Sequence, residues 1–135
     1  MKYCSKIFDR LKPLAIESNS GWARLSSAIV YKNQIVSTGV NSLKSHPFQK
    51  RFGRNSESIF LHAEISAIKN ALRHMTIDDI ADADLYVTRV KRENGRDSDF
   101  VSAMARPCAG CQRAIAEFGI RNVFYTTDKG TVECL

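Results

Sequence analysis

The chain of 135 residues lacks any long hydrophobic run. No stretch approaches the roughly 18 uninterrupted apolar residues of a membrane-spanning helix, and the first residues contain no apolar signal-peptide region. Low-complexity segments, internal repeats and linkers rich in proline or glycine are missing as well. We therefore expect one cytoplasmic domain over residues 1–135, with no membrane partner.

The chain has four cysteines, and their spacing does not suit a disulfide framework. Cys108 and Cys111 form a C-x-x-C pair, whereas Cys4 and Cys134 lie near the two ends of the sequence. A close pair with a distant histidine is typical of metal binding in a reducing compartment. A redox dithiol or two core cysteines are the alternatives for the pair, and we assign no role to Cys4 or Cys134.

Acidic residues are in deficit, because 14 Asp and Glu against 20 Lys and Arg leave a formal charge of +6. An excess of positive charge favours anionic partners such as nucleotides or polynucleotides. The segment 41–56 contains Lys44, Lys50, Arg51 and Arg54 but no carboxylate. This loop either binds a phosphate through charge-assisted hydrogen bonds or is an ordinary solvated loop.

Hydrophobic periodicity predicts helices alternating with strands. Helices are expected at 3–18, interrupted at Pro13, at about 61–74, and from Pro107 to Gly119. Strands are expected at 24–31, 34–40, 84–90, 120–126 and 131–134, and an exposed loop at 91–103. This order indicates an α/β fold, a three-layer sandwich whose mixed five-stranded sheet is flanked by helices.

Two short segments, His62-Ala63-Glu64 and Pro107-Cys108-Ala109-Gly110-Cys111, carry the chemistry. One histidine and two cysteines suit zinc, and three protein ligands leave the fourth position to water. Zinc lowers the pKa of that water from about 15.7 towards about 7, so hydroxide is available at neutral pH. Glu64 can take the proton of this water and pass it to a leaving amine. We therefore predict Zn²⁺ bound by His62, Cys108 and Cys111, with Glu64 as the catalytic residue.

The positions of these residues in the expected helices are compatible with a shared metal site. Cys108 and Cys111 are three residues apart and share a helix face, and Pro107 suits a first helical position, where the helix dipole favours thiolate. His62 and Glu64 would point in nearly opposite directions within a helix, whereas a first turn can let both reach one site. The alternatives are a core histidine for His62 and an ordinary surface carboxylate for Glu64.

The two segments resemble the H-x-E…P-C-x-x-C signature of the cytidine/deoxycytidylate deaminase superfamily, over residues 20–135. The run Gly39-Val40-Asn41-Ser42-Leu43-Lys44-Ser45-His46-Pro47 is also similar to small stand-alone deaminases of bacteriophages. The resemblance implies a cytidine deaminase-like fold and a hydrolytic enzyme that converts the cytosine of a nucleoside or nucleotide to uracil and releases ammonia.

The same resemblance implies two substrate contacts, and the sequence departs from the family's pattern at one position. The Ala63 amide would contact the base, and Asn41 would hydrogen-bond the sugar, although Asn41 could instead form the turn that ends its strand. Many nucleotide deaminases of this family have an asparagine where this chain has Ser66. That difference argues against a deoxycytidylate enzyme specifically and leaves the zinc chemistry intact.

The expected partner is thus a small-molecule nucleoside or nucleotide, with Lys44 and Arg51 as candidate phosphate contacts, and we expect a homo-oligomer. Two alternatives stay open. The same site could act on cytosine or adenine in RNA or DNA, although the chain has no separate nucleic-acid module. Alternatively, zinc could stabilise a binding protein without catalysis, with Cys4 or Cys134 as a fourth ligand.

Overall fold

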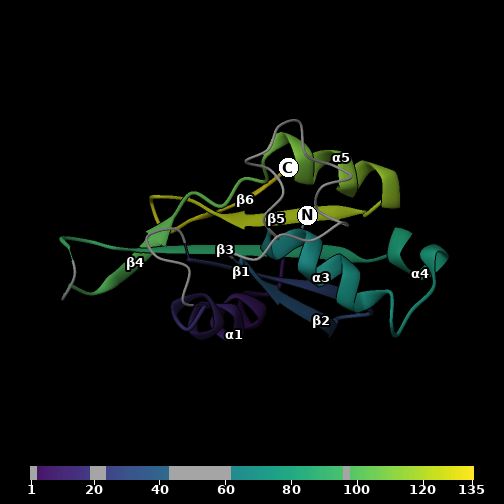
Figure 1. The fold of residues 1–135 in the computed structure, drawn as a ribbon, viewed down its shortest axis with the longest axis horizontal. Coiled ribbons are helices and arrows are strands. Elements are labelled where there is room, and N and C mark those ends of the chain that lie inside the picture. The colour runs from purple at the N-terminus through teal and green to yellow at the C-terminus, as the bar shows by residue number, and fades with distance from the viewer. Residues whose placement is uncertain (1–2, 19–23, 43–61, 96–97) are drawn as a thin grey trace.

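The computed structural model describes residues 3–18, 24–42, 62–95 and 98–135. A mixed β-sheet lies between two layers of helices (Figure 1). Its strands are β1 (Arg24–Tyr31), β2 (Gln34–Val40), β3 (Asp84–Arg92), β4 (Phe100–Ala103), β5 (Asn122–Thr126) and β6 (Val132–Cys134). The helices are α1 (Ser5–Ile16), α3 (Ala63–Ala71), α4 (Ile77–Ala81) and α5 (Ala109–Phe118).

The strands β1 and β2 form the expected hairpin. Lys32 and Asn33 at its turn both have positive φ, of 50° and 63°. These are angles of a type I′ turn, whose twist matches that of the strands on either side. On its other edge β1 pairs antiparallel with β3, so that Ala28 lies opposite Tyr86. The prediction of both strands and of their connection is confirmed.

The order of strands is β2-β1-β3-β5-β6, and β4 pairs with β3 off this path. The first half of β3 is parallel to β5, and its second half is antiparallel to β4. A parallel pair needs a crossover, which the connection through α5 provides. The five predicted strands are present, but β4 lies within 91–103, so the expectation of a loop over that whole stretch is wrong, and the sheet formed by the described residues has six strands.

The helices form the two outer layers of the predicted sandwich (Figure 1). Leu11 of α1 is fully buried in a cluster with Ala28 and Val30 of β1. Ile29 of the same strand belongs to a second cluster that includes Ile65 of α3. Successive side chains of a strand point to opposite faces, so β1 contributes to both cores. The three-layer α/β class is confirmed.

Helix α1 is continuous, which differs from the interruption expected at Pro13. A proline within a helix removes one backbone hydrogen bond. Here the buried residues Ile7, Leu11 and Ala15 hold the helix against the sheet on one side, while Pro13 is exposed on the other. Packing therefore outweighs the local preference. Within the described residues, none of the helices is long and apolar enough to cross a membrane.

Helix α5 begins two residues later than expected. Its first residue is Ala109 and its N-cap is Cys108, so Pro107 precedes the helix and does not open it. The helix ends as predicted, because Gly119 adopts the left-handed conformation that closes many helices, with φ of 69°.

Candidate metal centre and active site

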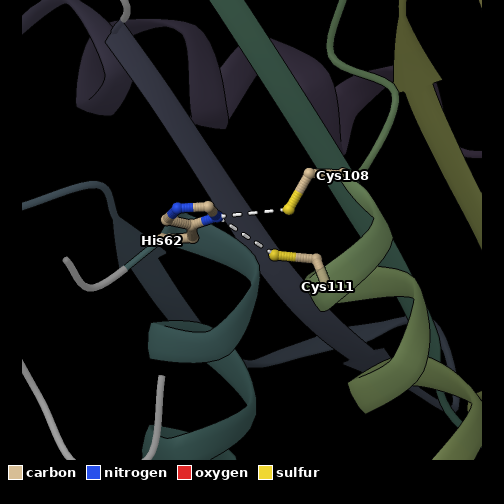
Figure 2. Close-up of side chains that lie close together, drawn as sticks. All are labelled: His62, Cys108 and Cys111. Atoms are coloured by element: carbon tan, nitrogen blue, oxygen red, sulfur yellow. Dashed lines mark hydrogen bonds between the residues drawn. The ribbon is translucent and has the colours of Figure 1, made fainter. Parts of the chain in front are cut away.

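Three predicted ligands come together where two helices begin (Figure 2). His62 is the N-cap of α3, Cys108 is the N-cap of α5, and Cys111 lies in the first turn of α5. The Nδ1 atom of His62 is 3.3 Å from the sulfur of Cys111 and 3.5 Å from that of Cys108. One ligand atom from each residue lies within 4.8 Å of the other two. The group is therefore compact enough to surround one metal ion.

The backbone at both N-caps explains how the side chains reach this position. His62 and Cys108 have extended backbones, with ψ of 155° and 171°, and neither side chain caps its own helix by a hydrogen bond. At most N-caps a side-chain oxygen accepts a bond from the helix backbone. An imidazole and a thiol are poorer hydrogen-bond acceptors for the helix backbone than a side-chain oxygen. Both side chains therefore project beyond the helix ends. Imidazole and thiolate together are a donor set that suits zinc.

The two thiols differ in protonation. The pKa of Cys108 falls to about 3, because Cys111 and then His62 donate hydrogen bonds to its sulfur. The hydrogen bond between the two sulfurs, together with burial, raises the pKa of Cys111. The hydrogen bond to Cys108 also raises the pKa of His62. A bound dication would favour the deprotonated form of both sulfurs.

Glu64 is buried in the first turn of α3, with 3% of its surface exposed. Burial raises the pKa of its carboxyl above the ordinary value. It therefore differs from the ordinary surface carboxylate that was the alternative for this residue. A carboxyl that gains a proton more readily is suited to general acid–base catalysis near neutral pH.

A close approach between β2 and α3 fixes the start of α3. A Cβ atom on Gly39 would lie 2.5 Å from the Ala63 carbonyl oxygen, so only glycine fits without movement. The hydroxyl of Ser27 donates to this same carbonyl at 2.6 Å, and that of Ser37 donates to the Ala67 carbonyl at 2.7 Å. These contacts bind the helix to the sheet and so position His62 and Glu64.

A cavity of about 270 Å³ opens beside the group. Its lining includes Leu25, Asn41, His62, Ala63, Glu64, Arg89, Met104, Ala105, Arg106 and Cys108. The cavity lining thus includes Asn41 and Ala63, the two residues that were expected to contact the sugar and the base. The Asn41 side-chain oxygen accepts a hydrogen bond from the Leu25 amide at 3.0 Å, so this residue also has a structural role at the strand end.

The remaining predicted residues lie elsewhere. Lys44 and Arg51 lie outside the described residues. Cys4 is the N-cap of α1 and Cys134 belongs to β6, and neither joins the metal-binding group. Among the described residues, no fourth His, Cys, Asp or Glu completes that group.

Sequence reasoning missed two arginines that line the cavity, Arg89 and Arg106. Arg106 directly precedes Pro107-Cys108, so its proximity in sequence to a predicted ligand could have identified it. Arg89 continues the strand face of Leu85 and Val87, so a charged residue at an otherwise apolar position was the signal that could have identified it.

Fold and site together define an α/β enzyme class with a mononuclear zinc centre. Residues 3–127 match the family model described as the cytidine and deoxycytidylate deaminase zinc-binding region. The chain belongs to this family and is an enzyme of the cytidine deaminase type, with Zn²⁺ as its cofactor. The resemblance found in the sequence is confirmed.

Solved structures show the same fold. Apo dCMP deaminase from cyanophage S-TIM5 has 20% identity and a TM-score of 0.60, covering 90% of this chain and 79% of that one. The same enzyme in complex with dCMP and dUMP has 19% identity and a TM-score of 0.57, covering 93% and 83%. Guanine deaminase from Bacillus subtilis has 22% identity and a TM-score of 0.54, covering 93% and 65%. A search of curated protein sequences found no match.

Proposed function

We propose that this protein is a zinc-dependent hydrolase that converts the cytosine of a nucleoside or nucleotide to uracil and releases ammonia. The observation that carries the proposal is the buried carboxyl of Glu64, which lines one cavity together with His62 and Cys108. A structural zinc site needs no proton-transferring group and has four protein ligands. The noncatalytic alternative therefore accounts poorly for this arrangement.

In this mechanism His62, Cys108 and Cys111 would hold zinc, which when bound would lower the pKa of a water to about 7. Glu64 would accept one proton of that water as the oxygen adds to C4 of the base, and pass it to the ring nitrogen. It would then take the second proton from the new hydroxyl group and deliver it to the departing amino group. Water and the amino compound are consumed, and the carbonyl product and ammonia are formed.

The remaining site residues orient the substrate in this proposal. The Ala63 amide contacts the base, and the Asn41 side chain bonds a sugar hydroxyl. Lys44 and Arg51 stay candidate phosphate contacts. We also propose a cytoplasmic homo-oligomer, and size-exclusion chromatography with light scattering tests its oligomeric state directly.

The deciding experiment is ammonia release from a panel of cytosine and adenine compounds. It contains free bases, nucleosides, mono- to triphosphates, and short RNA and DNA, each with the zinc-loaded protein. Release from cytosine nucleosides or nucleotides supports the proposal. Release only from the polynucleotides favours the nucleic-acid alternative, and no release from any compound overturns the enzyme function.

The variant Glu64→Gln supplies the mechanistic test, because glutamine keeps the size of the side chain but cannot carry protons. Turnover should fall by about 10²–10⁴-fold, while zinc content and melting temperature stay near those of the parent. Normal turnover in this variant would leave the reaction without its proton carrier.

A further inference from the structure

Two arginines line the cavity from different parts of the fold. Arg89 lies on β3 directly opposite Leu25 of β1, and both residues line the cavity. Leu25 in turn holds Asn41 by hydrogen bonds through its amide and carbonyl. Arg106 enters from the connection between β4 and α5, just before the ligand Cys108. The two cations thus come from separate elements but line one space.

Neither guanidinium is neutralised by a carboxylate of the described residues. Nη1 of Arg89 donates only a long hydrogen bond of 3.4 Å to the Met104 carbonyl, and its Nε is buried without a partner. Within the described ranges, no carboxylate forms an ion pair with Arg89 or Arg106, in contrast to Arg121, which binds Asp84 at 3.2 Å. A buried, unpaired N–H costs free energy until a ligand satisfies it.

Arg106 contacts a neutral group. Its Nη1 donates a long hydrogen bond to the Tyr125 hydroxyl at 3.4 Å, and that hydroxyl donates its own hydrogen to Glu133 at 3.1 Å. The phenol oxygen therefore presents a lone pair to Arg106. This contact leaves the charge of the guanidinium for another partner.

The negative groups that line the cavity already have other roles. Among its described lining residues, Glu64 is the single carboxylate, and proton transfer is its proposed role, while the Cys108 sulfur is a predicted zinc ligand. A neutral base and a sugar hydroxyl require no cation. Two guanidinium groups instead match the geometry and charge of a phosphate, which they bind by charge-assisted and often bidentate hydrogen bonds.

We propose that Arg89 and Arg106 form a phosphate-binding subsite, so that the substrate is a nucleoside monophosphate. The inference rests on the proposed function for the identity of the nucleoside. It places phosphate recognition on β3 and the connection before α5, independently of Lys44 and Arg51. The cavity of about 270 Å³ is small, close to the lower limit of small-molecule sites, and suits one nucleotide.

The test compares dUMP with deoxyuridine, and dCMP with deoxycytidine, on the zinc-loaded protein. Calorimetry gives affinities for the first pair, and initial rates give kcat/KM for the second. The parent should favour both monophosphates by at least about tenfold. Arg89→Gln and Arg106→Gln should each reduce the monophosphate-to-nucleoside ratio by about 10- to 100-fold, the effect of losing a charged hydrogen bond.

Arg73→Gln is the matched control, because Arg73 is an exposed arginine outside the cavity and should leave both ratios unchanged. Melting temperatures show whether each variant folds. Should Arg89→Gln fail to fold, Arg106→Gln carries the test alone, because its side chain is exposed. Equal affinity of the parent for both members of a pair, or equal losses for both members in the arginine variants, would overturn the subsite.

Binding and turnover separate this inference from the proposed function. Tight binding of dUMP that depends on the arginines, without deamination of dCMP, supports the subsite and contradicts the enzyme function. Deamination with equal kcat/KM for dCMP and deoxycytidine supports the proposed function and contradicts the subsite. A short single-stranded DNA that binds more tightly than dUMP, with a salt slope of about 0.7 per contacted phosphate over several phosphates, would also contradict a mononucleotide subsite.

Discussion

Replacing Gly39 by alanine should displace a metal ligand without removing any functional group. The new Cβ atom would lie 2.5 Å from the Ala63 carbonyl oxygen and 2.5 Å from the Ala67 amide nitrogen. Non-bonded carbon contacts are most favourable at about 3.5–4.0 Å, so β2 and α3 would have to separate by on the order of 1 Å. Both contacts are with backbone atoms, so no side-chain rotation relieves them.

The cost follows from the hydrogen bonds that cross this contact. Ser27 and Ser37 donate to helix carbonyls at 2.6 and 2.7 Å, and Asn70 donates to the Thr38 carbonyl at 3.0 Å. A separation of about 1 Å lengthens these bonds beyond useful range, at about 1 kcal/mol each. Overpacking alone costs about 1–3 kcal/mol. We expect the free energy of unfolding to fall by about 4–6 kcal/mol in Gly39→Ala.

The same displacement should reach the metal centre, because His62 and Glu64 lie at the start of α3. Metal–ligand distances tolerate deviations of about 0.2 Å, so a shift on the order of 1 Å in His62 weakens zinc binding. Misplacement by about 1 Å also lowers turnover by about 100-fold in the molecules that retain zinc.

Three measurements test this reasoning: melting temperature, zinc per chain by mass spectrometry, and turnover per bound zinc. Gly130→Ala is the control, since Gly130 has φ of 76° and an added Cβ atom there would have no neighbour within 4 Å. It should lose about 1–2 kcal/mol through backbone strain but keep zinc and turnover. A Gly39→Ala protein with the zinc content and turnover of the parent would refute the proposed link between this contact and the site.

Three further predictions concern the metal, the cavity and α1. Cys111→Ala should lose zinc and melt at a lower temperature, while Cys134→Ala, which alters an exposed thiol outside the group, should change neither value. Asn41→Ala leaves the Leu25 amide without its acceptor and should cost about 1–3 kcal/mol of stability, whereas Asn41→Asp keeps the acceptor oxygen and should chiefly raise KM. Pro13→Ala should raise the melting temperature, since it restores a helix donor at an exposed position; a lower value would show that the ring packs favourably.

Much of the fold could be predicted because the periodicity of apolar residues along the sequence indicates which segments form strands and helices. In β1 the alternation of side chains places Ile29 on one core and Ala28 and Val30 on the other, and periodicity alone gives that result. The turn at Lys32 and Asn33 follows from the two residues that separate the strands. The three side chains of the candidate metal centre were predicted by their chemistry and by the resemblance to a known family, and the structure brings them together.

Other features depend on partners distant in sequence. The four residues of β4 follow a charged stretch, and they form a strand because the second half of β3 offers a free edge. Arg89 occupies a strand position on the side of the sheet that faces α3 and α5, where periodicity favours an apolar residue. Gly39 could be read as the end of a strand, but its proximity to Ala63 depends on how α3 packs against β2.

The proton chemistry of the site depends on a similar combination of local and distant causes. Cys108 and Glu64 both lie at helix N-termini, where the helix dipole favours negative charge on each. Hydrogen bonds from Cys111 and His62 lower the pKa of Cys108 further, whereas burial raises that of Glu64. Opposite shifts in neighbouring groups separate their roles. A lowered pKa suits the Cys108 thiol to metal binding, and a raised pKa suits the Glu64 carboxyl to proton transfer. The sequence distinguishes the predicted ligand from the proposed proton carrier by their chemistry, whereas the burial and hydrogen bonds behind the two shifts depend on the packing of α3 and α5 against the sheet.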